Sequence, residues 1–218
     1  MRHMEQGLVW VLWLEPISPL QFSRDIQMTN RLQDRYTLVA IVLHWLIALV
    51  LISTIAVAWQ FDDAKGLAKF QLFQLHKSLG ITVLVLSLAR LGWRLIHPAP
   101  APLASLKPWE KFLSKAVHIG FYVVMLGLPL TGWLVVSASP KNIPTLLYGI
   151  IDLPYLPFVH GLAQEQAHNL EELFEEVHEA MGKVVYVLTV LHVGAALKHQ
   201  FIDRDSVLSR MVPFLKKS

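Results

Sequence analysis

Residues 178–192 read HEAMGKVVYVLTVLH, a mostly apolar stretch with a histidine at each end. In an α-helix, successive residues are rotated by about 100°, so the fourteen steps from His178 to His192 return to within about 40° of the starting direction. At a rise of about 1.5 Å per residue, the two side chains lie roughly 21 Å apart along the helix axis. The stretch therefore predicts an apolar helix that presents two imidazoles on one face, at two depths.

The composition of the whole chain is that of a membrane protein. Of its 218 residues, 54% are hydrophobic and only 16% are charged, and its mean hydropathy is +0.47. A segment of about 20 apolar residues crosses a hydrocarbon core of about 30 Å. Four runs are long enough, at about 38–59, 75–96, 117–138 and 178–199. Because backbone groups in lipid must be hydrogen-bonded within the protein, we predict an all-α, integral membrane four-helix bundle.

The charged residues predict how the bundle is oriented. Basic residues precede the first run, occupy the second loop and follow the fourth run, at Arg24, Arg31, Arg35, Lys107, Lys111, Lys115, Arg204, Arg210, Lys216 and Lys217. The third loop is acidic, with Asp152, Glu165, Glu171, Glu172, Glu175 and Glu176. The positive-inside rule therefore places both termini and the second loop in the cytoplasm, and the third loop outside.

The first 27 residues form an N-terminal extension of doubtful significance. Its apolar segment LVWVLWL (residues 8–14) is too short to span a membrane and lacks the small-residue cleavage site of a signal peptide. A second possible start lies at Met28. We therefore expect one transmembrane domain, residues 28–218, and assign no function to residues 1–27.

The chain contains no cysteine, which limits its redox chemistry. Disulfides, iron–sulfur clusters, thiolate zinc sites and covalent haem attachment through a C-x-x-C-H motif are all excluded. Any redox centre must be held by other ligands.

Four histidines inside the apolar runs fall into two pairs by depth. His44 lies about six residues from the cytoplasmic end of its run and His192 about seven, so both are about 10 Å deep on the inner side. His76 and His178 each begin a run that enters from the outer face. A single such histidine can be a hydrogen-bonded core residue, but ionisable groups within the membrane are costly, and four at two shared levels favour functional sites.

A small residue follows each of these four histidines by one helical turn. The residues at position i+4 are Ala48, Gly80, Gly182 and Ala196. Residues i and i+4 share a helix face, so this pattern leaves room beside each imidazole for a flat macrocycle. The pattern is absent at His118, His160, His168 and His199, which are followed by Tyr122, Gln164, Glu172 and Asp203.

Arginine completes the pattern on the second run. Arg90 follows His76 by fourteen residues, which puts its guanidinium on the same helix face at the depth of the inner pair. A guanidinium suits the carboxylate of a haem propionate. Both Arg90 and Arg94 can instead extend to the inner membrane surface, and for Arg94 we favour that alternative.

Two imidazoles at each level indicate haem rather than zinc. Bis-imidazole ligation holds low-spin haem iron for electron transfer, whereas zinc needs further protein ligands or water, and neither level supplies further protein ligands. We therefore predict two b-type haems, with His44 and His192 as axial iron ligands of the inner haem and His76 and His178 as those of the outer haem.

Longer motifs resemble a known family over about residues 28–218. They are RYTLVAIVLHWL (35–46), HKSLG (76–80), ARLGWRL (89–95), HIGFYVVMLGLPLTGW (118–133) and VHEAMGKVVYVLTVLHVGAALKHQF (177–201). In these segments the sequence resembles the bacterial cytochrome b561 family of four-helix, di-haem membrane proteins. The resemblance maps haem ligation onto the same four histidines, His44, His76, His178 and His192.

The resemblance also implies a function and a location. The expected protein is a quinone-linked oxidoreductase of the bacterial inner membrane that carries electrons between a periplasmic donor and ubiquinone or another quinone. At least one family member oxidises superoxide, so superoxide is a candidate donor. The acidic third loop would repel this anion unless Lys77, Lys141 or Lys183 supplies a local positive patch. The expected partners are the lipid bilayer, the quinone and the donor, with no nucleic acid.

Other interpretations of the sequence remain open. The same four helices could form the cytochrome b electron-transfer subunit of a membrane-bound dehydrogenase or hydrogenase. A haem-free, proton-coupled transporter would use the histidines as proton relays, and a visible spectrum would distinguish it. His118 is an alternative inner ligand or a quinone contact. Candidate quinone contacts chosen by location alone are Arg90, His118, Lys198 and His199.

Overall fold

The computed structural model describes residues 35–212, together with residues 18, 214 and 215. The predicted N-terminal extension, residues 1–27, lies outside the described residues apart from Ser18.

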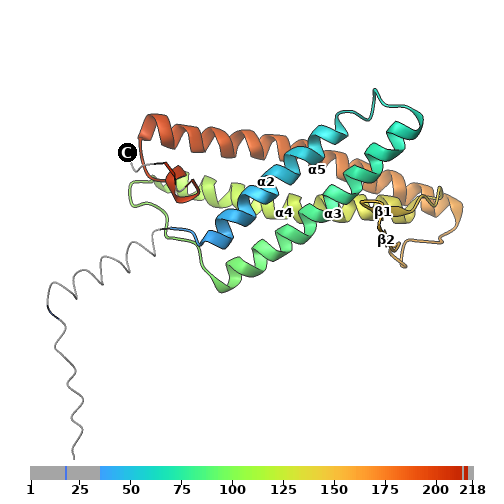
Figure 1. Cartoon of the computed structure of the whole chain (residues 1–218), viewed down its shortest axis with the longest axis horizontal. Coiled ribbons are helices and arrows are strands. Elements are labelled where there is room, and N and C mark those ends of the chain that lie inside the picture. Colours follow the sequence, from blue (N-terminus) through green and yellow to red (C-terminus); the bar gives the residue numbers. More distant parts are fainter. Residues whose placement is uncertain (1–17, 19–34, 213, 216–218) are drawn as a thin grey trace, which may run out of the picture. The chain divides into compact units, whose positions relative to one another are not determined.

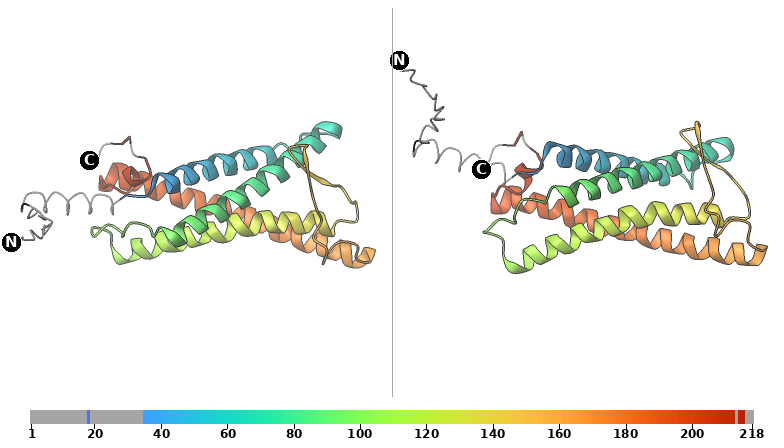
Figure 2. Two further views of the ribbon diagram at one scale, coloured as in Figure 1. Left: turned by 60° about the horizontal axis from the view of Figure 1, so that its bottom comes forward. Right: turned by 90° about the horizontal axis from the view of Figure 1, so that it is seen from below.

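Four long helices make up most of the described chain (Figure 1). They are α2 (Leu38–Ala58), α3 (Gly66–Ile96), α4 (Pro108–Ala138) and α5 (Gln164–Lys198). Each is long and apolar enough to cross a membrane. Helix α2 pairs with α3 and α4 pairs with α5, while α3 packs on α4 to join the two pairs (Figure 2). The predicted four-helix membrane bundle is therefore confirmed.

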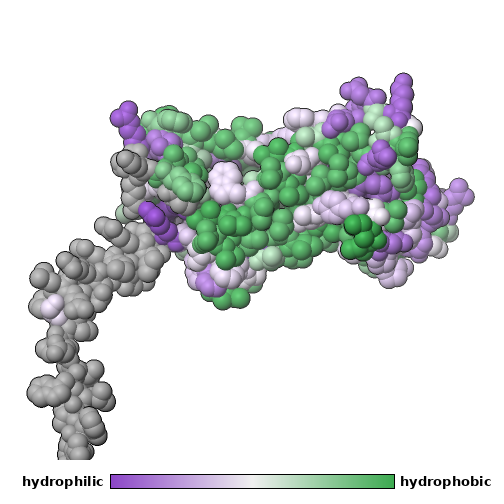
Figure 3. Space-filling view, in the orientation of Figure 1, coloured by the Kyte–Doolittle hydropathy of each residue, from purple (hydrophilic) through white to green (hydrophobic). Residues whose placement is uncertain are grey.

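Most of the apolar surface faces outward. In each membrane-spanning helix only a small share of the apolar window is buried inside the protein, and hydrophobic side chains cover the middle of the surface (Figure 3). Hydrophilic residues gather towards the two ends of the bundle in the same view. A hydrophobic waist between polar ends is the surface that a bilayer-spanning bundle requires.

Three helices begin earlier than the apolar runs in the sequence. Helices α3 and α4 each start nine residues before the runs at 75 and 117, and α5 starts fourteen residues before the run at 178. Hydropathy detects only the part of a helix that lies in lipid, and the polar turns before it are helical as well. In α5 these extra turns carry the glutamates of the third loop, whereas Asp152 lies on strand β2 (Ile151–Leu153).

A row of glycines on α4 lets α5 approach closely. A Cβ atom at Gly120 would lie 3.2 Å from a methyl carbon of Leu188, and one at Gly127 would overlap the side chain of Met181. Small residues at helix interfaces allow this kind of close packing inside membranes. Because Gly120 meets Leu188 and Gly127 meets Met181, the two helices are antiparallel, and these contacts fix how far α5 is shifted along α4.

The protein core lies between α2, α3 and α4. Ile47, Val83 and Met125, one from each helix, form its centre, and partly buried side chains such as Phe121 surround them. Ser87 of α3 is fully buried, and its small side chain fits this three-helix contact. The core occupies the middle of the bundle, between the levels of the two histidine pairs.

The end of the bundle that carries the β-strands is called the hairpin end below. Strands β1 (Thr145–Leu147) and β2 (Ile151–Leu153) form an antiparallel hairpin in the third loop. The hairpin is fastened to α3, because the backbone N–H of Tyr148 donates to Ser78 Oγ (2.9 Å) and Gln74 Nε2 donates to the Pro144 carbonyl (2.8 Å).

The opposite end, which carries the start of α2 and the end of α5, is called the tail end. Helix α5 continues there into one π-helical turn, His199–Asp203, and Arg204 follows in the left-handed conformation with φ of 52°. The chain then turns back, so that the N–H of Asp205 donates to the carbonyl of His199 (3.1 Å). Trp45 Nε1 of α2 donates to the Met211 carbonyl (2.9 Å), which ties the C-terminal segment to α2.

Candidate functional site

At the hairpin end, His76 of α3 faces His178 of α5. Their ring centres lie 6.2 Å apart, with the ring planes at 72°. The Nδ1 atom of His76 lies 3.2 Å from the carbonyl oxygen of Thr54 on α2, and that of His178 lies 3.0 Å from the carbonyl oxygen of Leu128 on α4. A carbonyl only accepts hydrogen bonds, so both rings carry their proton on Nδ1, and Nε2 is left as the free lone pair.

Helix α4 shapes the place where His178 lies. Pro129 interrupts the hydrogen-bond ladder of α4, and the hydroxyl of Thr131 donates to the nearby Leu128 carbonyl (2.9 Å) while lying 3.1 Å from His178 Nδ1. A Cβ atom at Gly132 would come within 3.1 Å of His178 Cε1. The glycine therefore provides the space that the imidazole ring occupies.

At the tail end, His44 of α2 faces His192 of α5. Their ring centres lie 6.0 Å apart, with the planes at 68°. The ring of His192 also meets two side chains of α4, His118 at 5.5 Å and Phe121 at 5.4 Å, both edge-on. Within residues 35–212, no protein hydrogen bond holds the ring nitrogens of His44 or His192, whereas His118 Nδ1 lies 2.6 Å from the carbonyl of Ser114.

The two ring pairs are the pairs that the depth argument predicts, and their spacing suits an iron atom. A metal lies about 2 Å from a histidine nitrogen, so two imidazoles on opposite sides of one ion have ring centres about 6 Å apart. The measured separations are 6.0 and 6.2 Å. His118 lies nearer to His192 than this spacing, and its Nδ1 contacts its own helix.

The space around the histidines also fits a flat group. Along the described residues, α5 approaches the backbones of α2 and α3 at only a few points. His192 and His178 of α5 nevertheless face His44 of α2 and His76 of α3. A Cβ atom at Gly80 or Gly182, one turn from His76 and His178, would meet nothing within 4 Å. Contacts between the helices therefore do not explain these two glycines, and the residues present fit a haem at each level.

Arg90 lies at the tail end of α3, as its spacing from His76 predicts. Its Nη1 donates to the carbonyl of Ala40, one turn before His44, over 2.5 Å. The guanidinium borders a small cleft between α2, α3 and α4. The cleft is lined by Tyr36, Ala40, Arg90, Trp93, Arg94, His97, Ala99 and Tyr122. Two arginines and two phenols give this cleft the chemistry to bind a carboxylate.

The lysines near the hairpin end differ in how free their charges are. Lys141 Nζ lies 3.6 Å from a carboxylate oxygen of Glu171, which offsets its charge. Lys77 Nζ donates to the uncharged carbonyl of Pro144 (3.0 Å), and in the described part of the chain it has no carboxylate partner. Lys183 is exposed on α5. Lys77 thus keeps an uncompensated charge one residue from His76.

The prokaryotic cytochrome b561 sequence pattern matches residues 35–214. The chain belongs to this family. It is 31% identical over 185 residues to "Cytochrome b561 homolog 2" of Escherichia coli (strain K12), covering 82% of this chain and 92% of the relative. "Cytochrome b561 homolog 1" of the same organism is 30% identical over 182 residues, 83% of this chain and 98% of the relative. "Probable superoxide oxidase CybB" of Yersinia pestis is 26% identical over 186 residues, 84% of this chain and 98% of the relative.

Membership of the cytochrome b561 family confirms the broad predictions. The chain is a multi-pass protein of the bacterial inner membrane from a family of electron-transfer proteins that bind b-type haem. A haem-free transporter is therefore the wrong interpretation. The haem ligands, the number of haems, the donor and the quinone stay predictions.

Sequence reasoning missed the groups that hold the hairpin-end imidazoles. They are the carbonyls of Thr54 and Leu128, the hydroxyl of Thr131 and the missing side chain of Gly132. Pro129 and Gly132, close together in an apolar run, were the available signal. No sequence pattern predicts that a particular backbone carbonyl will accept a hydrogen bond from a histidine, because every residue in the chain carries a carbonyl group.

Proposed function

We propose that this cytochrome b561 family member holds two b-type haems and carries electrons across the membrane from a periplasmic donor to the quinone pool. One observation carries the proposal. Helix α5 presents His178 and His192 on one face at two levels, and each faces a histidine from another helix at the spacing that an iron atom requires.

The histidines have defined roles in this proposal. His76 and His178 would hold the iron of one haem through Nε2, and His44 and His192 would hold the iron of the other. When bound, haem supplies reversible one-electron chemistry. The Thr54 and Leu128 carbonyls fix the orientation of the hairpin-end rings. Arg90 would hold a carboxylate of the haem at the tail end, as the carboxylate-binding chemistry of its cleft supports.

Charge distribution supports the direction of transfer. The positive-inside rule places the tail end in the cytoplasm and the hairpin end in the periplasm. Electrons from a periplasmic donor then enter at the His76–His178 level and leave to quinone at the His44–His192 level. His118 is the alternative ligand or quinone contact at the inner level, since its ring lies beside His192.

Superoxide is the first candidate donor. A relative is named a probable superoxide oxidase, and the uncompensated ammonium of Lys77 next to His76 would attract an anion. Oxidation of superoxide to dioxygen releases one electron, which matches the capacity of one haem. Two superoxide ions therefore supply the two electrons that reduce one quinone to quinol.

A soluble protein is the second candidate donor, and the acidic N-terminal part of α5, residues 164–179, favours it. This part carries exposed carboxylates at Glu165, Glu172, Glu175, Glu176 and Glu179. Such a surface would attract a basic electron-transfer protein or the soluble part of a dehydrogenase or hydrogenase.

Stopped-flow reduction of the purified protein by superoxide, with and without a ubiquinone analogue, tests the proposal. We expect rapid haem reduction by superoxide, and reoxidation only when the quinone analogue is present. Lys77→Glu should slow the reduction and weaken its salt dependence, because steering of an anion by a charge is screened beyond about 8 to 10 Å. Lys65→Glu, an equal charge change in the loop before α3, is the control.

The opposite salt dependence would favour the second candidate. A rate that is unchanged by Lys77→Glu, or that rises as salt screens the carboxylates of α5, contradicts superoxide as the physiological donor.

A further inference from the structure

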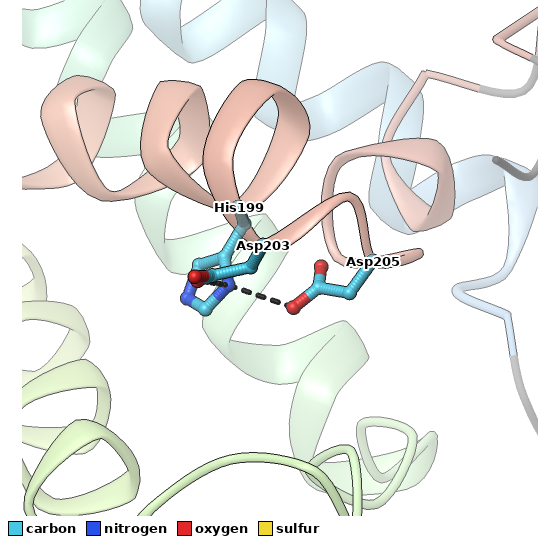
Figure 4. Close-up of side chains that lie close together, drawn as sticks. All are labelled: His199, Asp203 and Asp205. Atoms are coloured by element: carbon cyan, nitrogen blue, oxygen red, sulfur yellow. Dashed lines mark hydrogen bonds and ion pairs between the residues drawn. The ribbon is translucent and has the colours of Figure 1, made fainter.

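A cluster of charged side chains lies at the tail end of α5 (Figure 4). The Nδ1 atom of His199 lies 2.8 Å from a carboxylate oxygen of Asp205 and 3.0 Å from one of Asp203. Asp203 is the last residue of the π-helical turn, and the left-handed Arg204 turns the chain so that Asp205 comes back towards the ring. The local fold therefore brings two acids to one nitrogen of one imidazole.

The cluster lies beyond the tail-end histidine pair, towards the C-terminal end of α5. His199 follows His192 by seven residues, which returns it to within about 20° of the same helix face and about 10 Å further along the axis. His178, His192 and His199 thus share one face of α5. The side chain of His199 is only 12% exposed, whereas that of Asp203 is 31% exposed. The ring is therefore enclosed, and one of its acids reaches water.

Two further charged groups face the cluster. Lys198 Nζ lies 2.5 Å from Asp203 Oδ2 and 3.0 Å from Glu110 Oε1, which belongs to α4. The positive charge of Lys198 partly offsets the negative charge of Asp203, and its contact with Glu110 links the cluster to α4. The side chains of His199, Asp203 and Asp205 lie within 4.8 Å of one another, a spacing that could hold a metal ion. They already pair with one another and with Lys198, so no metal ion is needed to explain the cluster.

Reduction of quinone needs protons as well as electrons. A quinone becomes a quinol by taking up two electrons and two protons, one proton on each oxygen. The proposed function supplies the electrons at the His44–His192 level, but it names no proton donor. Histidine changes charge between about pH 5 and pH 8, which makes it suited to this role.

We propose that His199, held by Asp203 and Asp205, delivers the protons consumed when quinone is reduced at the tail end. The carboxylates keep the Nδ1 proton in place and stabilise the imidazolium. Nε2–H gives its proton to a quinone oxygen as an electron arrives, leaving neutral imidazole. A proton from water then returns to Nε2, and the same transfer to the second oxygen completes the quinol. This inference rests on the proposed quinone reduction.

The test measures oxidation of the pre-reduced protein by two acceptors in stopped flow. Decylubiquinone takes up protons with its electrons, whereas ferricyanide takes up an electron alone. We expect His199→Gln to slow oxidation by decylubiquinone about 10²-fold, the lower end of what general acids contribute. Added imidazole should restore part of the rate, and oxidation by ferricyanide should be unchanged. The wild-type rate with decylubiquinone should fall as the pH rises, because proton delivery needs a protonated donor, and this pH dependence should vanish in His199→Gln.

Two further variants make the test specific. Asp205→Asn keeps the imidazole but removes one of the two carboxylates that hold Nδ1, so oxidation by decylubiquinone should slow less than in His199→Gln and oxidation by ferricyanide should be unchanged. His168→Gln removes an imidazole that pairs with Glu172 (3.3 Å) at the other end of α5, and it should leave both rates unchanged. Haem content and reduced spectra of every variant establish that the bundle is intact.

Three outcomes would overturn the inference. His199→Gln could retain the wild-type rate and pH profile with decylubiquinone. Oxidation by ferricyanide could slow in the same proportion, which would mean that His199 supports the fold or the haem. Wild-type protein that is not oxidised by decylubiquinone at all would overturn the quinone assignment itself, and this inference with it.

Discussion

The hairpin-end and tail-end histidine pairs have nearly the same spacing but different support. At the hairpin end, a carbonyl from a neighbouring helix faces Nδ1 of each ring, and α4 leaves a glycine gap for His178. At the tail end, the rings of His44 and His192 have no protein hydrogen bond within residues 35–212, and aromatic edges surround His192 instead. Equal spacing therefore does not mean equal rigidity.

The difference bears on how each pair would hold a cofactor. An imidazole whose Nδ1–H is held by a carbonyl is oriented before the ligand arrives and is a stronger base at Nε2. The hairpin-end pair is oriented in this way. The tail-end pair depends on packing and on the nearby charge of Arg90. We expect the hairpin-end haem to respond sharply to small changes in α4, and the tail-end haem to tolerate them.

Removing a ligand is the largest change and tests whether the two pairs are separate. His76→Ala and His178→Ala should each lose the hairpin-end haem and keep the other, whereas His44→Ala and His192→Ala should do the reverse. Each single variant should retain about one haem per chain instead of two, because bis-imidazole ligation needs both rings. Haem quantification and low-temperature spectra measure the outcome.

His118 provides the control for this experiment. If it is not a ligand, His118→Ala should keep both haems. Loss of the same haem in His76→Ala and His192→Ala would show that the pairing by level is wrong.

Filling the open space beside a ligand should have the next largest effect. Gly182→Leu places a bulky side chain one turn from His178, in space that no protein atom occupies. Overpacking costs about 1 to 3 kcal/mol, which corresponds to a roughly five- to 150-fold loss of affinity for the hairpin-end haem. Titration of haem into the haem-depleted protein measures this affinity.

Gly194→Leu is the matched control for Gly182→Leu. Gly194 lies on the same helix and also has open space around it, but it is two residues from His192 and so points away from the ligand face. Haem affinity should be unchanged in this variant. Equal loss of haem in both variants would mean that the glycines matter only for the helix or for lipid contact.

The smallest expected effect comes from one methyl group on α4. In Gly132→Ala the new Cβ would lie 3.1 Å from His178 Cε1, so the ring must rotate or shift by a few tenths of an ångström. Rotating a side chain off its preferred angle costs about 0.5 to 1.5 kcal/mol, or about two- to twelvefold in affinity for the hairpin-end haem. A change in the spectrum of that haem alone should accompany the loss.

Gly120→Ala tests whether the effect belongs to the imidazole. Its Cβ would be equally close to Leu188, at 3.2 Å, but a leucine side chain can move without disturbing a ligand. Both haems should keep their spectra in this variant. If the two alanine variants behave alike, the gap at Gly132 serves helix packing and the comparison between the pairs loses its basis.

The sequence predicted the architecture and the positions of the four histidines well. A helix repeats every 3.6 residues and a bilayer has a fixed thickness, so face and depth follow from counting residues along each run. The same counting could not find the true starts of α3, α4 and α5, because their first turns are polar and leave no hydropathy signal. It favoured His44 as the partner of His192 by the small residue at i+4, but it left His118 open as an alternative, since both histidines lie near the same level.

By itself, the sequence determined the membrane class, the four spans, the two levels and the absence of thiolate ligands. These properties depend on composition and on positions within one helix. Only the tertiary structure decided what holds each ring. The contact of His76 with the Thr54 carbonyl joins residues 22 apart, and that of His178 with the Leu128 carbonyl joins residues 50 apart. Such contacts depend on how helices pack against one another, and any backbone carbonyl at that place would serve, so no residue type marks them in the sequence.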